Sequence, residues 1–310
     1  MARSSSSDSG GFLFKTGIFA VLAAAAFWVF NQFSGKKNTD TPSAQTEVLS
    51  DHPLPVKNPN LPTVEPDQAT VPEEILPAPG AGEIVRHTYY TLCYAEDHEQ
   101  AEWVAYELSR DRLNENWVAR TNSFRPDPDV HTESATPRDY NATGFDKGHL
   151  CPAADMAFSE QAMDETFFMS NMSPQVPAFN MGIWRELEEL TRDWARKFGH
   201  LYVVTGPILT QPRIGQIGFS KVTVPSYYYK VLLAPEQHRA IAFMLPNQVS
   251  TQPVLDYAYS IDQVEKTTGL DFFPQVLKGL DEELEGSLDK AAWPIDKKRY
   301  QERVVTWNKK

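Results

Sequence analysis

Residues 139–156 read DYNATGFDKGHLCPAADM, and residues 165–190 read ETFFMSNMSPQVPAFNMGIWRELEEL. In the first stretch Gly148 precedes His149, and glycine allows a close backbone approach or a positive φ. In the second stretch Asn180 opens a predicted helix, and Glu188 follows two turns later. Imidazole is a base with an ordinary pKa of about 6.5, and amide and carboxylate oxygens are ligands that Mg²⁺ prefers. A base and a hard-cation site on adjacent elements are suited to the attack of water on a phosphodiester.

The two stretches resemble the DNA/RNA non-specific endonuclease family. Its signature, Asp-Arg-Gly-His followed by small residues, corresponds to DKGHLCPAA at 146–154. SNMSPQVPAFNMGIWRELE at 170–188 is similar to the family's metal-binding helix and the segment before it. The blocks occur in the family's order and at its approximate spacing, and the resemblance extends from Thr88 to Phe273. It implies an α+β protein with the ββα-metal (His-Me finger) nuclease fold, in which helices flank a central, mostly antiparallel sheet.

The resemblance also implies roles for individual residues. His149 would be the general base that activates water, and Asn180 would be the direct protein ligand of Mg²⁺, with Mn²⁺ as a substitute. Glu188 would act in catalysis by holding metal-bound waters. Each residue has a plainer alternative: His149 as a structural histidine, Asn180 as a helix N-cap and Glu188 as a solvated carboxylate. Lys147 stands where the family has arginine, so the positive charge is kept but bidentate contact with phosphate is lost.

Three more polar residues are expected near the site. Arg192 lies four residues after Glu188 and is expected among the catalytic groups, in contact with either phosphate or Glu188. Arg125, in the loop before the signature, is predicted to bind the substrate phosphate. Asn171 matches a further polar residue of the family site and is predicted to bind substrate, the alternative being that it stabilises its loop.

The function implied by the resemblance is metal-dependent, sequence-non-specific hydrolysis of DNA and RNA. Two alternatives stay open: a DNA-only nuclease, and a non-catalytic nucleic-acid-binding protein that keeps the fold. The formal net charge of −12 argues against a DNA-packaging protein, but a polyanionic substrate can still bind where basic groups converge. The oligomeric state is open, with a homodimer as one option.

Composition divides the chain into four predicted segments: an apolar leader (1–33), a proline-rich acidic linker (34–83), the nuclease domain (84–280) and a charged C-terminal extension (281–310). The leader has no charge from Thr16 to Phe33, which is near the lower length limit for a membrane-spanning helix. No small-residue cleavage site closes its apolar run, which favours an uncleaved anchor over a signal peptide. The domain is therefore expected to be membrane-anchored or secreted, in the periplasm or outside the cell.

The chain has two cysteines, Cys93 and Cys151, and no CxxC pair, so it lacks a four-thiolate zinc site. In an exported domain they could form a disulfide. The alternative is a pair of buried free thiols.

Local patterns predict the secondary structure. Strands are expected over 87–94, 201–209, 226–234 and 239–246, where β-branched and aromatic residues are frequent. Residues 101–110 fit a helix or a strand by periodicity, and the family resemblance favours a strand. Residues 145–150 are expected to form a short strand or a loop. Helices are expected over 159–166, 180–198 and 260–266, the last with a capping box of Ser260 and Gln263. In the longest helix the apolar residues recur at the helical repeat, and Gly199 is expected to end it; these residues are Ile183, Trp184, Leu187, Leu190, Trp194 and Phe198.

Overall fold

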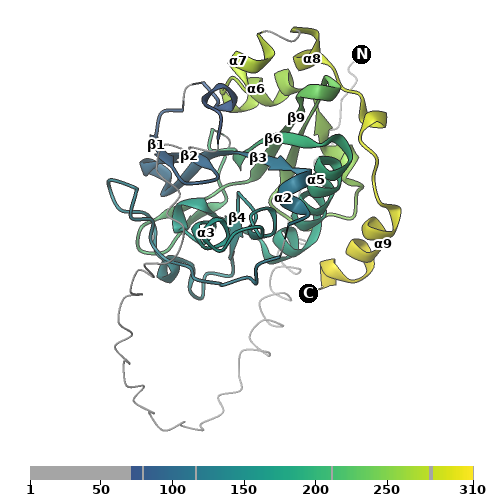
Figure 1. Ribbon diagram of the computed structural model, residues 1–310. Helices are drawn as coiled ribbons and strands as arrows, with labels where there is room; N and C mark the ends of the chain where they lie inside the picture. Colours follow the sequence, from purple (N-terminus) through teal and green to yellow (C-terminus); the bar gives the residue numbers. More distant parts are fainter. Residues whose placement is uncertain (1–70, 79, 116, 211, 279–281, 310) are drawn as a thin grey trace, which may run out of the picture. The chain divides into compact units, whose positions relative to one another are not determined.

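A seven-stranded sheet forms the centre of the fold (Figure 1). The computed structural model describes residues 71–309 apart from 79, 116, 211 and 279–281. Every neighbouring pair of strands in the sheet is antiparallel. In spatial order the strands are β1 (Glu83–Arg86), β2 (Thr91–Ala95), β3 (Gln100–Ser109), β6 (His200–Pro207), β9 (Tyr227–Ala234), β10 (Arg239–Pro246) and β11 (Ala258–Tyr259).

Both faces of the sheet are buried, as β3 illustrates. Val104 and Tyr106 belong to one hydrophobic cluster and Trp103 and Ala105 to another, because successive side chains of a strand point to opposite faces. The first face is covered by helices α2 (Arg110–Leu113), α3 (Glu160–Glu165) and α5 (Arg185–Phe198), and the second by α6 (Ile261–Thr268), α7 (Pro274–Leu277) and α8 (Glu282–Gly286) (Figure 1). The expected α+β class with a central antiparallel sheet is confirmed.

A two-stranded ribbon and the helix after it lie on the first face. Strand β4 (Asp146–His149) pairs antiparallel with β5 (Met172–Gln175), so that His149 faces Met172 across the ribbon. The chain then passes through the short helix α4 (Pro177–Phe179) into a π-helical turn at Asn180–Trp184 and on into α5. A second ribbon, β7 (Gly215–Ile217) with β8 (Val222–Val224), packs beside β5.

The predicted helix over 180–198 is therefore regular only from Arg185. Gly182 has φ −101° and ψ −112°, which interrupts the helix one turn after it starts. All six predicted apolar residues are buried, and Gly199 ends α5 with φ 106°. The capping box of Ser260 and Gln263 is confirmed, and the other predicted strands and helices agree within two residues, with one exception.

The exception is the strand predicted over 87–94, which is a hairpin instead. β1 ends at Arg86, and β2 begins at Thr91, its register partner. The four residues between them turn because the His87 backbone N–H donates to the Tyr90 carbonyl at 2.9 Å and the two rings pack at 4.6 Å. The aromatic content of this segment thus reflects a packed turn as well as a strand.

The folded part begins before the predicted linker ends. Val71 and Ile75 are buried in the second cluster, and the backbone of Ala78 pairs with that of Asp271. The prolines around these residues led to the prediction of a linker as far as 83, but the apolar side chains between them pack on the sheet. The predicted leader at 1–33 lies outside the described residues. Among the described residues, no helix is long and apolar enough to span a membrane.

Of the two alternatives for the cysteines, the pair of buried free thiols is confirmed and the disulfide is absent. Cys93 and Cys151 are both free and buried. Cys93 packs in the cluster on one face of the sheet and Cys151 in the cluster on the other, so the sheet separates the two thiols. Burial raises the pKa of both thiols above the ordinary value, which keeps them protonated.

Gly148 is required by the close approach of β4 to β5. A Cβ built on Gly148 would lie 2.2 to 2.5 Å from three side-chain atoms of Gln175, which is fully buried. We predict that Gly148→Ala lowers the free energy of unfolding by about 1–3 kcal/mol, as overpacking usually does, in urea melts of the purified protein. Gly215→Ala is the matched control, because no atom lies within 4 Å of the added Cβ. Equal stability of the two variants would contradict the predicted contact.

Candidate active site

The ribbon and the π-helical turn are tied together beside His149. The Trp184 indole N–H donates to the His149 carbonyl at 3.4 Å, which joins the end of β4 to the start of α5. Lys147, two residue pairs from His149 along the ribbon, faces Pro174. Two strands followed by a helix thus bring the Asp146–His149 segment to Asn180, although more than thirty residues separate them.

His149 lies in an aromatic pocket and is only 8% exposed. Its ring packs edge-on against Phe167, with centroids 5.1 Å apart, and at 5.9 Å from Phe124. Burial, together with the positive charge of Arg120, lowers the pKa of His149 to about 3. Its Nε2 atom is buried and makes no hydrogen bond. The ring is therefore neutral at ordinary pH and has an unused nitrogen, as a general base requires.

The side chain of Asn180 is oriented by Asp146. Its amide nitrogen donates to Asp146 Oδ2 at 2.9 Å. An ionised carboxylate only accepts hydrogen bonds, so the NH₂ side of the amide must face Asp146 and the carbonyl oxygen must face away. Asn180 is not an N-cap, because it is itself helical and its side chain caps no backbone N–H of the turn. Its amide oxygen is thus presented as a hard ligand atom.

Glu188 and Arg192 lie on one face of α5, but they do not form an ion pair, which was one of the two alternatives for Arg192. Arg192 Nη1 binds Asp155 Oδ1 at 2.7 Å, and Asp155 Oδ2 accepts a hydrogen bond from the Tyr106 hydroxyl at 2.9 Å. Burial raises the pKa of the Glu188 carboxyl to about 7, and Arg192 and Lys230 oppose that rise. Asp155 has a positioning role that the sequence alone does not indicate, because its partners come from a distant strand and helix.

One pocket of about 470 Å³ unites five of the predicted residues. They are His149, Lys147, Asn180, Glu188 and Arg192. The pocket adds Arg120 and Arg185, which the motifs did not indicate, so its basic side chains outnumber its carboxylates, Glu188 and Glu189. Arg120 Nε donates to Asn122 Oδ1 at 2.7 Å, and its guanidinium lies 4.9 Å from the centroid of the Phe167 ring that also packs on His149. A local positive surface therefore exists on an acidic protein.

Arg125 and Asn171 do not line this pocket. Arg125 pairs with Asp164 at 2.7 Å and stacks on Phe168 at 4.1 Å. Asn171 is fully buried, and its amide bonds the backbone of Cys151 and the carbonyl of Thr166. Asn171 therefore holds the loop around Cys151, which was its alternative, and substrate binding by Arg125 and Asn171 stays a prediction. Arg120, from the same loop as Arg125, lines the pocket.

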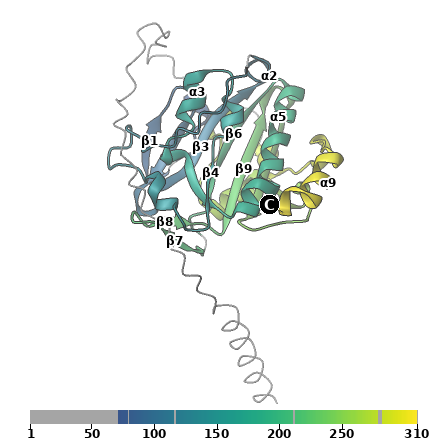
Figure 2. The same cartoon turned by 90° about the horizontal axis from the view of Figure 1, so that it is seen from below.

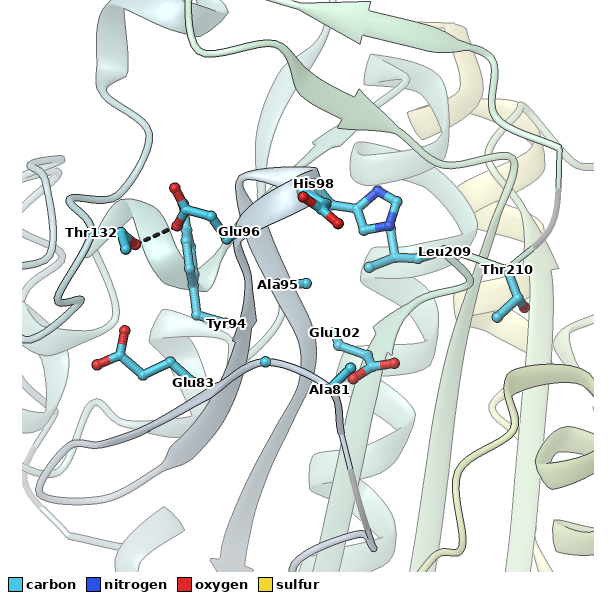
Figure 3. Close-up of a pocket in the computed structure, with 12 residues that line it drawn as sticks. Ala81, Glu83, Tyr94, Ala95, Glu96, His98, Glu102, Thr132, Leu209 and Thr210 are labelled. Atoms are coloured by element: carbon cyan, nitrogen blue, oxygen red, sulfur yellow. Dashed lines mark hydrogen bonds between the residues drawn. The ribbon is translucent and has the colours of Figure 1, made fainter.

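A second pocket, of about 380 Å³, has the opposite charge (Figure 3). Carboxylates line it, and Figure 3 shows Glu83 and Glu96 on the side of Tyr94 and Thr132, with Thr132 bonded to Glu96 and with His98 and Glu102 across from them. A phosphate backbone would be repelled there. Two groups in the described part of the chain have the composition of a cation site, His87–Asp127–Asp129 and Asp262–Glu265–Glu285, and neither contributes a residue to the lining of the pocket that holds His149. The basic pocket is the one suited to a nucleic acid.

The low pKa of His149 has a direct NMR consequence. A ring with a pKa of about 3 stays neutral, so its Cε1–Hε1 resonance should not shift between about pH 8 and 5. In urea the same ring should titrate at about 6.5. Because His149 binds a proton less readily in the folded state than in the unfolded state, it lowers the free energy of unfolding as the pH falls below the pKa of the unfolded ring. The resonance is assigned by its loss in His149→Ala, and a folded-state midpoint near 6.5 would disprove burial of the neutral base.

Comparison with known proteins identifies the family. Residues 67–279 match the DNA/RNA non-specific endonuclease family model. Mitochondrial endonuclease G of Homo sapiens is 34% identical over 214 residues, covering 64% of this chain and 72% of that protein. Nuclease C1 of Cunninghamella echinulata var. echinulata is 37% identical over 214 residues, covering 63% of this chain and 84% of that protein.

A solved structure supports the same assignment. A chain in the structure titled "Crystal structure of the EndoG/EndoGI complex: Mechanism of EndoG inhibition" superposes with a TM-score of 0.60 at 29% identity, covering 65% of this chain and 90% of that one. The chain described here belongs to the DNA/RNA non-specific endonuclease family, and it is a metal-dependent endonuclease.

Proposed function

We propose that this enzyme hydrolyses phosphodiesters of DNA and RNA with water activated by His149, at a Mg²⁺ site made by Asn180. One observation carries the proposal: a neutral histidine with an unused Nε2 shares a pocket with an amide whose oxygen is turned away from Asp146. In this arrangement His149 takes the proton from water as the water oxygen attacks phosphorus, the bond from phosphorus to the leaving sugar oxygen breaks, and solvent water protonates that oxygen. The ring nitrogen needs no prior deprotonation because burial keeps it neutral.

The residues around Asn180 fit a hard divalent cation. The protein donors are one amide oxygen and the Glu188 carboxylate, and such a sparse set suits Mg²⁺, which keeps most of its waters. Glu188 would hold those waters and not the ion itself. When bound, the cation would supply positive charge to the phosphate oxygens. Mn²⁺ has the same preference for oxygen and is expected to substitute.

The basic residues of the pocket bind the phosphate groups on either side of the reacting bond. Arg120 is exposed, and the Arg185 side chain is 40% exposed although it pairs with Glu189. Arg192 is mostly buried and is held by Asp155. Lys147 lies 5.1 Å from the centroid of the Phe124 ring, which limits its motion. Contacts to phosphate carry no sequence information, which is the physical basis for cleavage without sequence preference.

We further propose that the apolar leader at 1–33 anchors the domain to a membrane or directs its export, and that the domain works outside the cytoplasm. The uncharged run from Thr16 to Phe33 supports this. Extraction of membranes with alkaline carbonate tests anchoring, since an anchored chain stays in the pellet and release of the full-length chain would refute the anchor. Light scattering of the purified protein would show whether it is a homodimer.

The main prediction concerns His149 and the metal. Plasmid DNA and RNA are incubated with wild type and His149→Ala, each with Mg²⁺ and with EDTA. We expect wild type to cleave both polymers with Mg²⁺ alone, and His149→Ala to be slower by about 10²–10⁴, the usual contribution of a general base. Cleavage of DNA alone would favour the narrower nuclease. Binding in a gel shift without cleavage by wild type would favour the non-catalytic alternative.

Arg120 and Arg125 provide a second test, because they lie five residues apart and differ in placement. Arg120→Met should lower kcat/KM by about 10-fold and weaken the salt dependence of binding, since a phosphate contact is lost. Arg125→Met should leave kcat/KM near wild type and lower stability by less than about 1 kcal/mol, because the Asp164 pair is partly exposed. If instead Arg125→Met loses activity and Arg120→Met keeps it, the proposed phosphate site is wrong.

A further inference from the structure

The C-terminal segment lies outside the matched family domain, which ends at residue 279. Its 14 charged residues at 281–310 predict a solvated extension, yet the structure packs it against α5 (Figure 2). Trp293 is 1% exposed and meets Trp194 edge-on at 5.1 Å, while Trp194 donates to the Pro294 carbonyl at 2.7 Å. The segment then forms α9 (Lys297–Val305) and a short turn at Trp307–Lys309.

A buried arginine fixes α9 beside the start of α5. Arg303 is fully buried; its Nε binds Glu186, and its remaining donors reach the carbonyls of Ser250 and Gln252. Removing one partner of such a pair leaves a charge without compensation in the interior, which is strongly destabilising. One turn earlier Arg299 binds Glu189 and Asp193, at 2.9 and 2.7 Å. Residues 297–309, the tail, are thus joined to α5 at three acidic residues, which are Glu186, Glu189 and Asp193.

The last turn of the chain contacts the turn that carries Asn180. Asn308 Nδ2 donates to the Ser250 carbonyl at 2.8 Å, and its Oδ1 is buried only 2.7 Å from the point where a Cβ on Gly182 would lie. This close approach is available only because residue 182 is glycine. Trp307 is 5% exposed, and the Arg185 guanidinium stacks over its ring at 4.0 Å. Arg185 and Glu189, both held by the tail, line the active-site pocket.

The turn at Asn180–Trp184 depends on outside support, because it is π-helical and interrupted at Gly182. Asp146 supports it from the ribbon, and the tail supports it from the opposite end of the chain. We propose that residues 297–309 are a positioning element for this turn, so that the affinity of the active site for a divalent cation depends on Trp307 and Asn308. The inference rests on the proposed cation site at Asn180.

The test compares tail variants of the full chain in direct binding of Mn²⁺, followed by EPR without substrate. Trp307→Ala and Asn308→Ala should each weaken Mn²⁺ binding by roughly 10-fold, the lower end of what supporting contacts contribute to a metal site, and should raise the Mg²⁺ concentration for half-maximal cleavage equally. Trp307→Phe should restore most of the affinity, since it keeps an aromatic ring under Arg185. Val305→Ala, at the end of α9 just before the turn at Trp307–Lys309 but 60% exposed, is the control expected to behave as wild type.

Thermal melts show whether each variant is folded at the assay temperature. If Trp307→Ala is unfolded, the Mn²⁺ affinity of Asn308→Ala, the smaller change, tests the proposal. Folded variants that bind Mn²⁺ as tightly as wild type would overturn the role of the tail while leaving the nuclease proposal intact. If the wild-type protein neither binds Mn²⁺ nor cleaves nucleic acid, both the role of the tail and the nuclease proposal are wrong.

Discussion

A carboxylate accepts hydrogen bonds but donates none, and this property of Asp146 sets the geometry of the active site. Because Asp146 takes the amide nitrogen of Asn180, the amide oxygen must point the other way. The same strand ends in His149, three residues along, and its pairing with β5 holds both side chains in register. The proposed base and the proposed cation ligand therefore have their relative positions fixed by one short ribbon and one hydrogen bond.

The buried polar groups of this site lower the stability of the fold, and packing elsewhere must offset that loss. His149 is buried as a neutral ring with one nitrogen unpaired, and Glu188 carries a carboxyl whose pKa is raised to about 7. Lys230 is also fully buried, with its ammonium 5.0 Å from the centroid of the Trp184 ring. Unpaired buried polar groups are unfavourable for folding, and they accumulate where their reactivity is needed. The aromatic walls and the buried core of both sheet faces offset them.

The sequence was enough to predict the parts of the site that lie in short motifs. His149, Lys147, Asn180, Glu188 and Arg192 share the pocket because the ribbon and one helix contain all five. Contacts across long separations could not be read in this way. Arg120 and Arg125 sit in one irregular loop, and only packing on Phe167 or pairing with Asp164 distinguishes them.

The same limit applies at the ends of the folded part. The prolines around Val71 and Ile75 pointed to a linker, although both side chains are buried. The many charges of the C-terminal segment gave no sign that Trp293 and Trp307 are buried. For Cys93 and Cys151, the sequence gives no indication that the sheet lies between them. In each case the deciding interaction is made with a residue far away in the chain, which local periodicity does not report.

The most direct measurement of the central claim is an anomalous difference map from crystals of the protein soaked in Mn²⁺. The geometry predicts a peak in the basic pocket beside the Asn180 amide oxygen, on the side of Glu188. A peak confined to His87, Asp127 and Asp129, with none beside Asn180, would contradict the proposed active site.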